Sequence, residues 1–299
     1  MSADSGWRIN AAMNDTSKSL GRSISRRLKS APVSAILLII GGVWLIPNIG
    51  LFFQSLRTPA AISESGWWTA ILDFGSLSLD PYRNLLASPI IVRSIWNTFA
   101  ITIPSTVLVV LISAFAGYAL GCMRFRGRDA IFLGVVALLV VPVQVALIPI
   151  AQLYNRLGIF GSLAGLILFH VGFGLPFGVF LLRNMYSTIP RALFEAAKVD
   201  GAGHGRIFFT MALPLVSPSI ASLSIFQFVW VWNNLLAALV FTRQSSAPLT
   251  VAIQQQMRNF GSNVDIIAPA AFLLLLVPML IFLAFQRFFV EGMTGGSVK

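Results

Sequence analysis

Runs of about 20 predominantly apolar residues recur along this chain, and no other feature limits its fold as strongly. An α-helix needs about 20 residues to cross a hydrocarbon core about 30 Å thick. The chain has 299 residues, of which 57% are hydrophobic and 10% charged, whereas soluble domains carry about 25% charged residues. The runs lack the alternating segments of about 10 residues that build a membrane β-barrel. The sequence therefore predicts an all-α integral membrane protein.

Six segments have the length and composition of membrane-spanning helices. Their expected bounds are 33–56, 95–121, 130–153, 161–183, 215–241 and 266–286. The polar segment before them is too long for a signal-peptide n-region, so we expect the first span to be retained. Residues 1–32 then form a basic tail, and residues 33–299 form one transmembrane domain with its core at about 93–286.

Positive charge is distributed unevenly between the two sides that six spans define. Of the 21 Lys and Arg residues, 15 fall on the side of the two termini and six on the other. Cytoplasmic loops carry the excess of Lys and Arg, so we expect both termini in the cytoplasm. Membrane lipid is the expected solvent of the spans. The asymmetry also accounts for the net charge of +11, and we expect no nucleic-acid partner.

Several kinds of chemistry are missing from the sequence. No lysine follows a glycine, which excludes a phosphate-binding GxxxxGK[ST] loop. Cys122 is the single cysteine, so an intrachain disulfide and a cysteine-built metal site are excluded. His170 and His204 are too far apart for HExxH, and we expect His170 to be a hydrogen-bonded structural residue. We therefore expect no catalytic residue and no metal.

Two classes of membrane protein can be compared with this pattern. A stand-alone secondary carrier would usually place acidic residues within its spans, and Asp and Glu are nearly absent there. A membrane-embedded enzyme or scaffold would need reactive residues that converge at the end of a span. We find none, and both classes remain as the alternatives.

Glycines and prolines are expected to shape the bundle. Small residues four apart allow helix backbones to approach closely. This spacing occurs at Gly117–Gly121, Gly161–Gly165 and Gly174–Gly178. Prolines remove a backbone donor and can kink a helix. Among the prolines within the expected spans are Pro104, Pro142, Pro149, Pro176 and Pro278.

A polar, glycine-rich stretch, 195-EAAKVDGAGHGRIFFTMALP-214, interrupts the apolar sequence. Residues 191–199 are good helix formers and predict a helix of about nine residues. Ser187 or Thr188 is expected to cap its start, with Pro190 in the first turn.

The same stretch carries signals for the end of this short helix and for a second helical piece after it. Gly201 and Gly203 are expected to end the first helix, and residues 204–212 form the second, amphipathic piece. Glu195 and Lys198 are spaced for a weak surface ion pair. A helix as short as the first is unstable alone in water. It either rests on lipid headgroups or docks onto another protein, and the residues alone leave both open.

The stretch resembles the EAA loop in the membrane subunits of binding-protein-dependent ABC importers. The matching residues are Glu195, Ala196, Ala197, Asp200, Gly201, Ala202, Phe208, Leu213 and Pro214. Other segments resemble the carbohydrate branch of that family, in particular its shorter, maltose-permease-like subunit. They include WNTFAIT, YALGCMRFRGR, LIPIAQLYNRLGIFGS, WVWNNLLAALVF and QRFFVEGMTGGSVK. Cys122 departs from the polar or basic residue that many relatives carry before the RFRG turn.

The resemblance implies a type I ABC importer transmembrane domain whose 187–214 loop holds a cytoplasmic coupling helix. Glu195 and Asp200 would hold the joint with an ATPase subunit, Gly201 would permit its turn, and Ala196 and Ala197 would set its depth, with Ala202 following. The implied partners are a second, homologous permease subunit, two ATPase subunits, a periplasmic solute-binding protein and a sugar. This chain then carries no cofactor, because ATP and Mg are bound by the ATPase.

A path for sugar needs aromatic faces together with amide or hydroxyl groups. The fifth span offers Gln227, Trp230, Asn233 and Asn234, and the third offers Gln144. A helix-packing role for each of these residues is equally compatible with the sequence. In relatives the connection between the fifth and sixth spans faces the binding protein, which suggests residues 243–262 for that contact.

The charge asymmetry generates a direct prediction of topology. In a Cys122→Ala background, Ser76→Cys should react with a membrane-impermeant maleimide added to intact cells, because residue 76 lies on the poorly charged side. Lys198→Cys should react after the membrane is opened. The reverse pattern of labelling would contradict the assignment.

Overall fold

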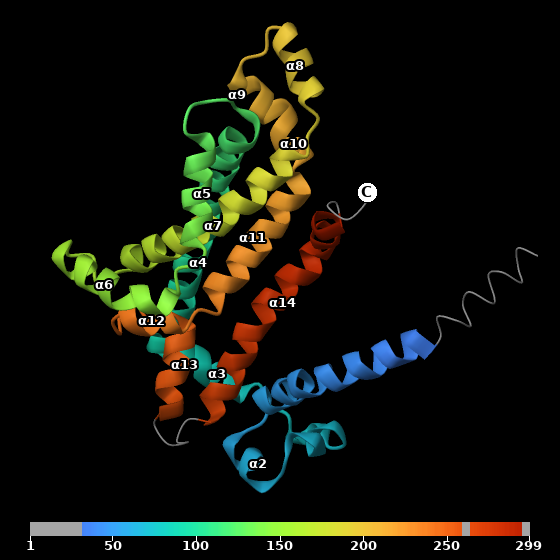
Figure 1. The fold of residues 1–299 in the computed structure, drawn as a ribbon. Coiled ribbons are helices and arrows are strands. Elements are labelled where there is room, and N and C mark those ends of the chain that lie inside the picture. The colour runs from blue at the N-terminus through green and yellow to red at the C-terminus, as the bar shows by residue number, and fades with distance from the viewer. Residues whose placement is uncertain (1–31, 259–263, 295–299) are drawn as a thin grey trace, which may run out of the picture.

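The computed structural model describes residues 32–258 and 264–294, and the side chains of 32–257 and 266–286. The expected tail, 1–32, lies almost entirely outside these residues. The long helices α4, α7, α11 and α14 run side by side, whereas the first helix extends away from them; α8 stands at one end of the molecule, and α2, α3 and α13 lie at the other (Figure 1). The first helix is Pro32–Ser55. The following elements are α2 (Pro59–Glu64), η1 (Trp67–Ile71), η2 (Phe74–Ser76), α3 (Asp80–Ala87), α4 (Pro89–Cys122), α5 (Arg128–Leu138), α6 (Val143–Arg156), α7 (Leu163–Ser187), α8 (Arg191–Val199), α9 (His204–Ile207), η3 (Phe208–Ala212), α10 (Leu213–Leu215), α11 (Ser217–Trp232), α12 (Leu236–Phe241), α13 (Leu249–Arg258) and α14 (Val264–Thr294).

Four helices in the described residues are long and apolar enough to cross a membrane. They are Pro32–Ser55, Pro89–Cys122, Leu163–Ser187 and Ile266–Gln286. Two further candidates are bent pairs, with 99° between α5 and α6 and 74° between 204–215 and α11. The all-helical membrane fold is thus confirmed, and the count reaches six if each bent pair is one span.

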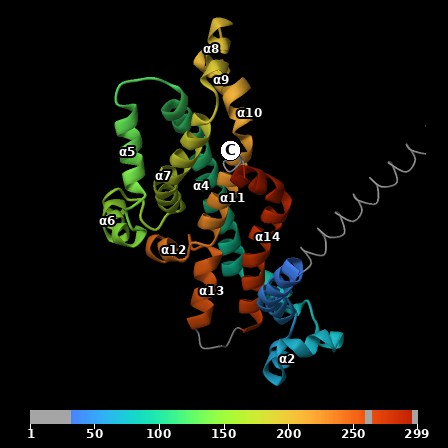
Figure 2. The same cartoon turned by 45° about the vertical axis from the view of Figure 1, so that its right-hand side comes forward.

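The spans expected at 130–153 and 215–241 are each interrupted, the first by the bend between α5 and α6 and the second by the end of α11. The chain leaves helical geometry between α5 and α6, where Pro142 adopts an extended backbone and precedes the first turn of α6. Proline lacks the N–H that would continue the ladder of α5. The α11 helix ends at Trp232, and α12 follows as a separate short helix. In Figure 2, α6 and α12 lie across the direction of α4 and α11.

The α4 and α7 helices pack closely along each other, and glycines set their separation. A Cβ added at Gly117 would lie 3.0 Å from the backbone nitrogen of Arg183, and one at Gly121 would lie 3.0 Å from the Cβ of Tyr186. From the other side, a Cβ at Gly178 would lie 2.3 Å from the Oγ of Ser113. The prediction of close helix packing is confirmed here.

The spacing rule fails at Gly161–Gly165. Gly161 lies in the turn between α6 and α7 with φ of +79°, a left-handed conformation that glycine adopts without a steric penalty. A Cβ there would lie 2.7 Å from the side chain of Arg243. The glycine therefore serves a turn and a close contact with a distant loop, and does not pack two helices.

Polar side chains of α4 fasten the loop that leads into α13. The Asn97 amide donates to the carbonyls of Ser245 and Ala247, each at 3.0 Å. The Leu249 N–H donates to the hydroxyl of Thr98 at 2.8 Å. These bonds explain why polar residues occur in the apolar α4, because a buried loop must satisfy its backbone groups.

An arginine organises the segment at the end of the molecule opposite α8. The Arg57 side chain is 1% exposed, and its guanidinium donates to the carbonyls of Ala61 and Ser65 at the end of α2. Carbonyls at a helix C-terminus carry partial negative charge and attract a cation. Nearby, the hydroxyl of Tyr82 hydrogen-bonds the Oγ of Ser55 at 2.8 Å. The segment is therefore a structured cap on the bundle.

The packing of α4 on α7 predicts different effects at two glycines. Gly117→Leu should lower the thermal midpoint of the purified protein in detergent, since its contact is with backbone that cannot rotate away and overpacking costs about 1–3 kcal/mol. Gly172→Leu is the matched control, because the space beside this exposed glycine of α7 is open. Equal midpoints for the two variants would contradict the packing argument.

Candidate functional site

The polar stretch forms α8, a helix of nine residues, as its composition predicted. The expected start is wrong in detail. Ser187 is the last residue of α7, Thr188 is its C-cap, and Pro190 is the N-cap of α8 without a side-chain hydrogen bond. The α7 helix extends four residues past its expected end, so the sequence that could cap α8 is used to finish α7. The expected pairing of Glu195 with Lys198 is also absent from the ion pairs of the described residues.

The end of α8 is a hydrogen-bonded glycine cap. Gly201 has φ of +79°, its N–H donates to the carbonyl of Lys198, and the N–H of Ala202 donates to that of Ala197. This pair of bonds is the Schellman arrangement, which depends on a left-handed residue. The role expected of Gly201 is thus confirmed. Gly203 instead has an extended backbone and precedes α9, so its expected role in ending α8 is wrong.

The two faces of α8 differ in what they contact. Phe194 and Ala197 pack against the cluster formed by the ends of α4, α7 and η3. Glu195, Ala196 and Asp200 are exposed. Val199 is 87% exposed and Leu193 is 45% exposed. The outer face of α8 therefore offers apolar side chains beside carboxylates, which is the composition of a surface that another protein can cover.

Tyr118 of α4 holds α8 and α9 onto the bundle. Its ring lies 5.2 Å from that of Phe208 and 5.8 Å from that of Tyr186, both edge to face, and 6.4 Å from that of Phe194. Its hydroxyl lies 3.3 Å from the Nδ1 of His204. Aromatic pairs of this geometry stabilise a contact by about 0.5–1.5 kcal/mol each beyond burial. One packed cluster therefore joins α8 to α4 and α7.

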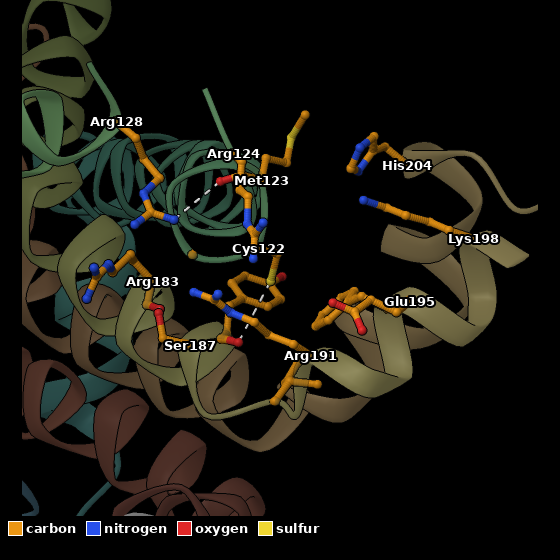
Figure 3. Close-up of a pocket in the computed structure, with 14 residues that line it drawn as sticks. Cys122, Met123, Arg124, Arg128, Arg183, Ser187, Arg191, Glu195, Lys198 and His204 are labelled. Carbon is orange, nitrogen blue, oxygen red and sulfur yellow. Dashed lines mark hydrogen bonds between the residues drawn. The ribbon is translucent and has the colours of Figure 1, made fainter. Parts of the chain in front are cut away.

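A hollow of about 390 Å³ lies between α8 and the ends of α4 and α7. Figure 3 shows Arg124, Arg128 and Arg183 around it, with Glu195 and Lys198 on the side of α8. Its other polar lining residues are Cys122, Tyr186, Ser187, Arg191 and His204. The hollow is strongly basic, and the sequence alone did not reveal it, since its arginines come from three separate loops and helix ends.

A second hollow, of about 280 Å³, lies between α7 and α11. Its lining residues are Phe173, Gly174, Phe177, Phe226, Gln227 and Trp230. Gln227 is 4% exposed, and its Nε2 has no hydrogen-bond partner within the described part of the chain. A few polar groups among aromatic rings are the usual lining of a small-molecule site.

Two residues of α7 set the positions of these groups. Gly174 leaves room for the amide of Gln227, since a Cβ there would lie 2.6 Å from its Nε2. His170 is buried, hydrogen-bonds the carbonyl of Leu166 at 2.9 Å through Nδ1, and meets the ring of Trp230 edge to face at 5.3 Å. The structural role expected of His170 is confirmed by this hydrogen bond.

The other residues suggested for a sugar path lie outside this hollow. Gln144 is exposed at the start of α6. Asn233 is exposed and donates to the carbonyl of Val229, while the Oδ1 of Asn234 accepts from the N–H of Ala237 and caps α12. The structure thus brings Gln227 and Trp230 together and leaves these three apart. Phe173, Phe177 and Phe226 were missed, because aromatic residues are common in any apolar span.

The segment suggested for contact with a binding protein lies at the end opposite α8 (Figure 1). It contains α13, and residues 259–262 are outside the described residues. Arg243 and Arg93 line a hollow of about 350 Å³ beside it. Among the described residues, no three His, Cys, Asp or Glu side chains are grouped as a metal site would require.

Comparison with known proteins places this geometry in context. The family described as "Binding-protein-dependent transport system inner membrane component" matches residues 95–295. The chain is 40% identical over 273 residues to the osmoprotective compounds uptake permease protein GgtD of Synechocystis sp., an alignment that covers 90% of this chain and 92% of that protein. It is 44% identical over 229 residues to the alpha-glucoside transport system permease protein AglG of Rhizobium meliloti, covering 74% of this chain and 60% of that protein.

A solved structure has the same fold. A chain in the crystal structure of a bacterial ABC transporter involved in the import of the acidic polysaccharide alginate superposes with a TM-score of 0.73. The two chains are 20% identical, and the match covers 89% of this chain and 98% of the other. At this identity the likeness concerns the fold alone.

Proposed function

Because this chain belongs to the family of binding-protein-dependent transport system inner membrane components, we propose that it is the permease subunit through which an ATP-driven ABC importer carries a sugar across the bacterial cytoplasmic membrane. The observation that carries the proposal is the position of α8. This short helix is held at one end of the bundle by a glycine cap and an aromatic cluster, and its outer face is left uncovered.

The proposed partners follow from that helix and from the chemistry that this sequence lacks. No phosphate-binding loop occurs in the chain, so ATP and Mg would be bound by two separate ATPase subunits, one of which would receive α8. A second, homologous permease would complete the transmembrane pathway. A periplasmic solute-binding protein would deliver the sugar at the end formed by α13. This orientation places both termini in the cytoplasm, as the charge distribution predicts.

The mechanism that we propose rests on the rigid connection between α8 and the bundle. Closure of the ATPase dimer moves α8, and the cluster around Tyr118 transmits that displacement to α4 and α7. The α7 helix also forms one wall of the aromatic hollow. ATP thereby favours one of two arrangements of the bundle, and the coupling is a difference in free energy between those arrangements.

A sugar, or a small sugar derivative, is the proposed substrate. Two relatives are named for osmoprotective compounds and for alpha-glucosides. The hollow between α7 and α11 supplies the aromatic faces of Phe173, Phe177 and Trp230 and the amide of Gln227. Aromatic rings stack on the apolar faces of a sugar ring, and an amide can both donate to and accept from its hydroxyls.

The docking of α8 is tested by Gly201→Asp, with Glu195→Ala as a second variant. Any side chain at the left-handed Gly201 costs roughly 1 kcal/mol or more, and a charge buried in a partner's groove costs more again. Both variants should bind purified ATPase subunits less tightly than the wild type in membranes and should lower uptake, while the amount of permease stays unchanged. Lys198→Ala should bind nearly as well as the wild type, since exposed charges contribute little.

Gly205→Asp is the matched control for this experiment. It adds the same charge to a glycine of α9 where the space is also open, but its φ is not left-handed. If Gly201→Asp and Gly205→Asp bind ATPase equally well, α8 rests on lipid headgroups and the docking proposal is wrong. Affinity capture of the wild type should retain both ATPase and binding protein, whereas uptake by the isolated chain would indicate a secondary carrier.

The proposed sugar path is tested by Gln227→Leu, which keeps the volume of the side chain and removes its amide. A hydrogen bond left unmade at a buried site costs about 1–3 kcal/mol, so uptake at subsaturating sugar should fall about tenfold or more, with ATPase binding retained. Gln286→Leu, an exposed glutamine of α14, is the control. Unchanged uptake by Gln227→Leu would remove this hollow from the path.

A further inference from the structure

The basic hollow beside α8 carries far more positive than negative charge. Its lining contains Arg124, Arg128, Arg183, Arg191 and Lys198 against the single carboxylate of Glu195. Within the described part of the chain, Arg128 pairs with Asp129 at 3.0 Å, and the other four cations make no ion pair. Like charges brought this close destabilise one another unless an anion lies among them. The arrangement therefore favours a negatively charged ligand.

Two residues that line the hollow carry buried donors that have no partner among the described residues. Tyr186 is 1% exposed, lines the hollow, and its hydroxyl has no partner among the described residues. The Nε of Arg183 is likewise buried without one. Burying a hydrogen-bonding group without a partner costs about 1–3 kcal/mol. Unused donors beside unpaired cations are complementary to a ligand that is rich in anionic oxygen.

Arg183 is held in place before any ligand arrives. Its guanidinium lies 4.2 Å from the centre of the Phe132 ring, and its NH1 donates to the Oδ1 of Asn184 at 3.3 Å. A cation over an aromatic face is stabilised by the ring and stays oriented. The side chain with the most restricted surroundings is therefore the one that presents a fixed positive charge to the hollow.

The level of the hollow identifies the source of the anion. It opens where two membrane-spanning helices, α4 and α7, come to an end. An adjoining hollow of about 380 Å³ shares Arg124, Arg128 and Arg191 and includes Phe125. From there the exposed apolar side chains of Ile131 and Leu133 continue along α5. An acyl chain can pack along this apolar surface, while the arginines contact the headgroup at the membrane boundary.

We propose that the hollow lined by Arg124, Arg183, Arg191 and Tyr186 binds the phosphate of an anionic phospholipid headgroup. The bound lipid would join α8, through Arg191, to the ends of α4 and α7. The content of anionic lipid in the membrane would then set how firmly α8 is held. This proposal requires that the chain spans a membrane, and it does not depend on which solute is carried or on where α8 docks.

An acidic surface of a partner protein is the rival occupant. The structure favours the lipid because the buried donor residue Tyr186 belongs to a membrane-spanning helix and lies in the same packed cluster as Phe194 of α8. A small headgroup can enter this space. A folded partner would meet the exposed outer face of α8 first.

The test measures lipid binding to the purified importer complex by native mass spectrometry, with phosphatidylglycerol or phosphatidylcholine added. The wild type should bind phosphatidylglycerol more tightly than phosphatidylcholine. The double variant Arg124→Gln, Arg191→Gln should raise the Kd for phosphatidylglycerol about tenfold or more, because hydrogen bonds to a charged group are among the stronger ones. Tyr186→Phe keeps the packed ring, removes the hydroxyl alone, and should raise the Kd about threefold or more.

Arg206→Gln is the matched control. It removes an exposed arginine of α9 that does not line the hollow, and it should leave the Kd unchanged. Equal binding of the two lipids by the wild type, or an effect of Arg206→Gln as large as that of the double variant, would overturn the proposal. Displacement of phosphatidylglycerol by an equal concentration of inorganic phosphate would identify a free-phosphate site and refute the lipid. Loss of the ATPase from the double variant with unchanged lipid binding would assign these arginines to the protein partner instead.

Discussion

The close approach of α4 and α7 is the constraint on which the rest of the structure depends. Gly117 and Gly121 bring the backbone of α7 against α4, and Gly178 does the same from the other side. Within a membrane, apolar surface gains little from leaving lipid for protein, so association relies on close packing and polar contacts. The α7 helix bounds both the basic hollow beside α8 and the aromatic hollow that contains Gln227. The basic hollow lies where α4 and α7 end. The geometry of these two hollows therefore depends on the glycines that set the separation of α4 and α7.

Polar contacts supply the specificity that apolar packing lacks at both ends of this pair. At one end, Asn97 and Thr98 bind the loop that leads into α13. At the other, Tyr118 reaches His204 and meets the aromatic rings that support α8. One helix, α4, therefore carries fixed attachments to segments that lie at opposite ends of the molecule. The two ends of the molecule are thus joined by a continuous series of packed contacts, through which energetic coupling can be carried.

Some groups in the structure are incomplete by themselves, and they occur where the proposals place partners. The Nε2 of Gln227 is unused beside aromatic rings, and the hydroxyl of Tyr186 is unused beside arginines. Apolar and acidic side chains share the outer face of α8. The site at Gln227 is complementary to a neutral polar solute, and the site at Tyr186 is complementary to an anion. The outer face of α8 is complementary to a protein surface. Buried polar groups are normally satisfied, so these exceptions are the most informative features of the chain.

The sequence by itself determined the membrane class, the bounds of α8 and the left-handed turn at Gly201. Those features depend on local composition, on the length of apolar runs and on the freedom of glycine, all of which can be read from neighbouring residues. Several details failed where local signals competed, as when Ser187 and Thr188 finished α7 instead of capping α8. Only the tertiary structure decided the sharp bend before Pro142, the hollow shared by Gln227 and Trp230, and the convergence of Arg124, Arg183 and Arg191. In lipid, the outside of a helix is as apolar as its packed face, so no amphipathic period reveals which residues will meet.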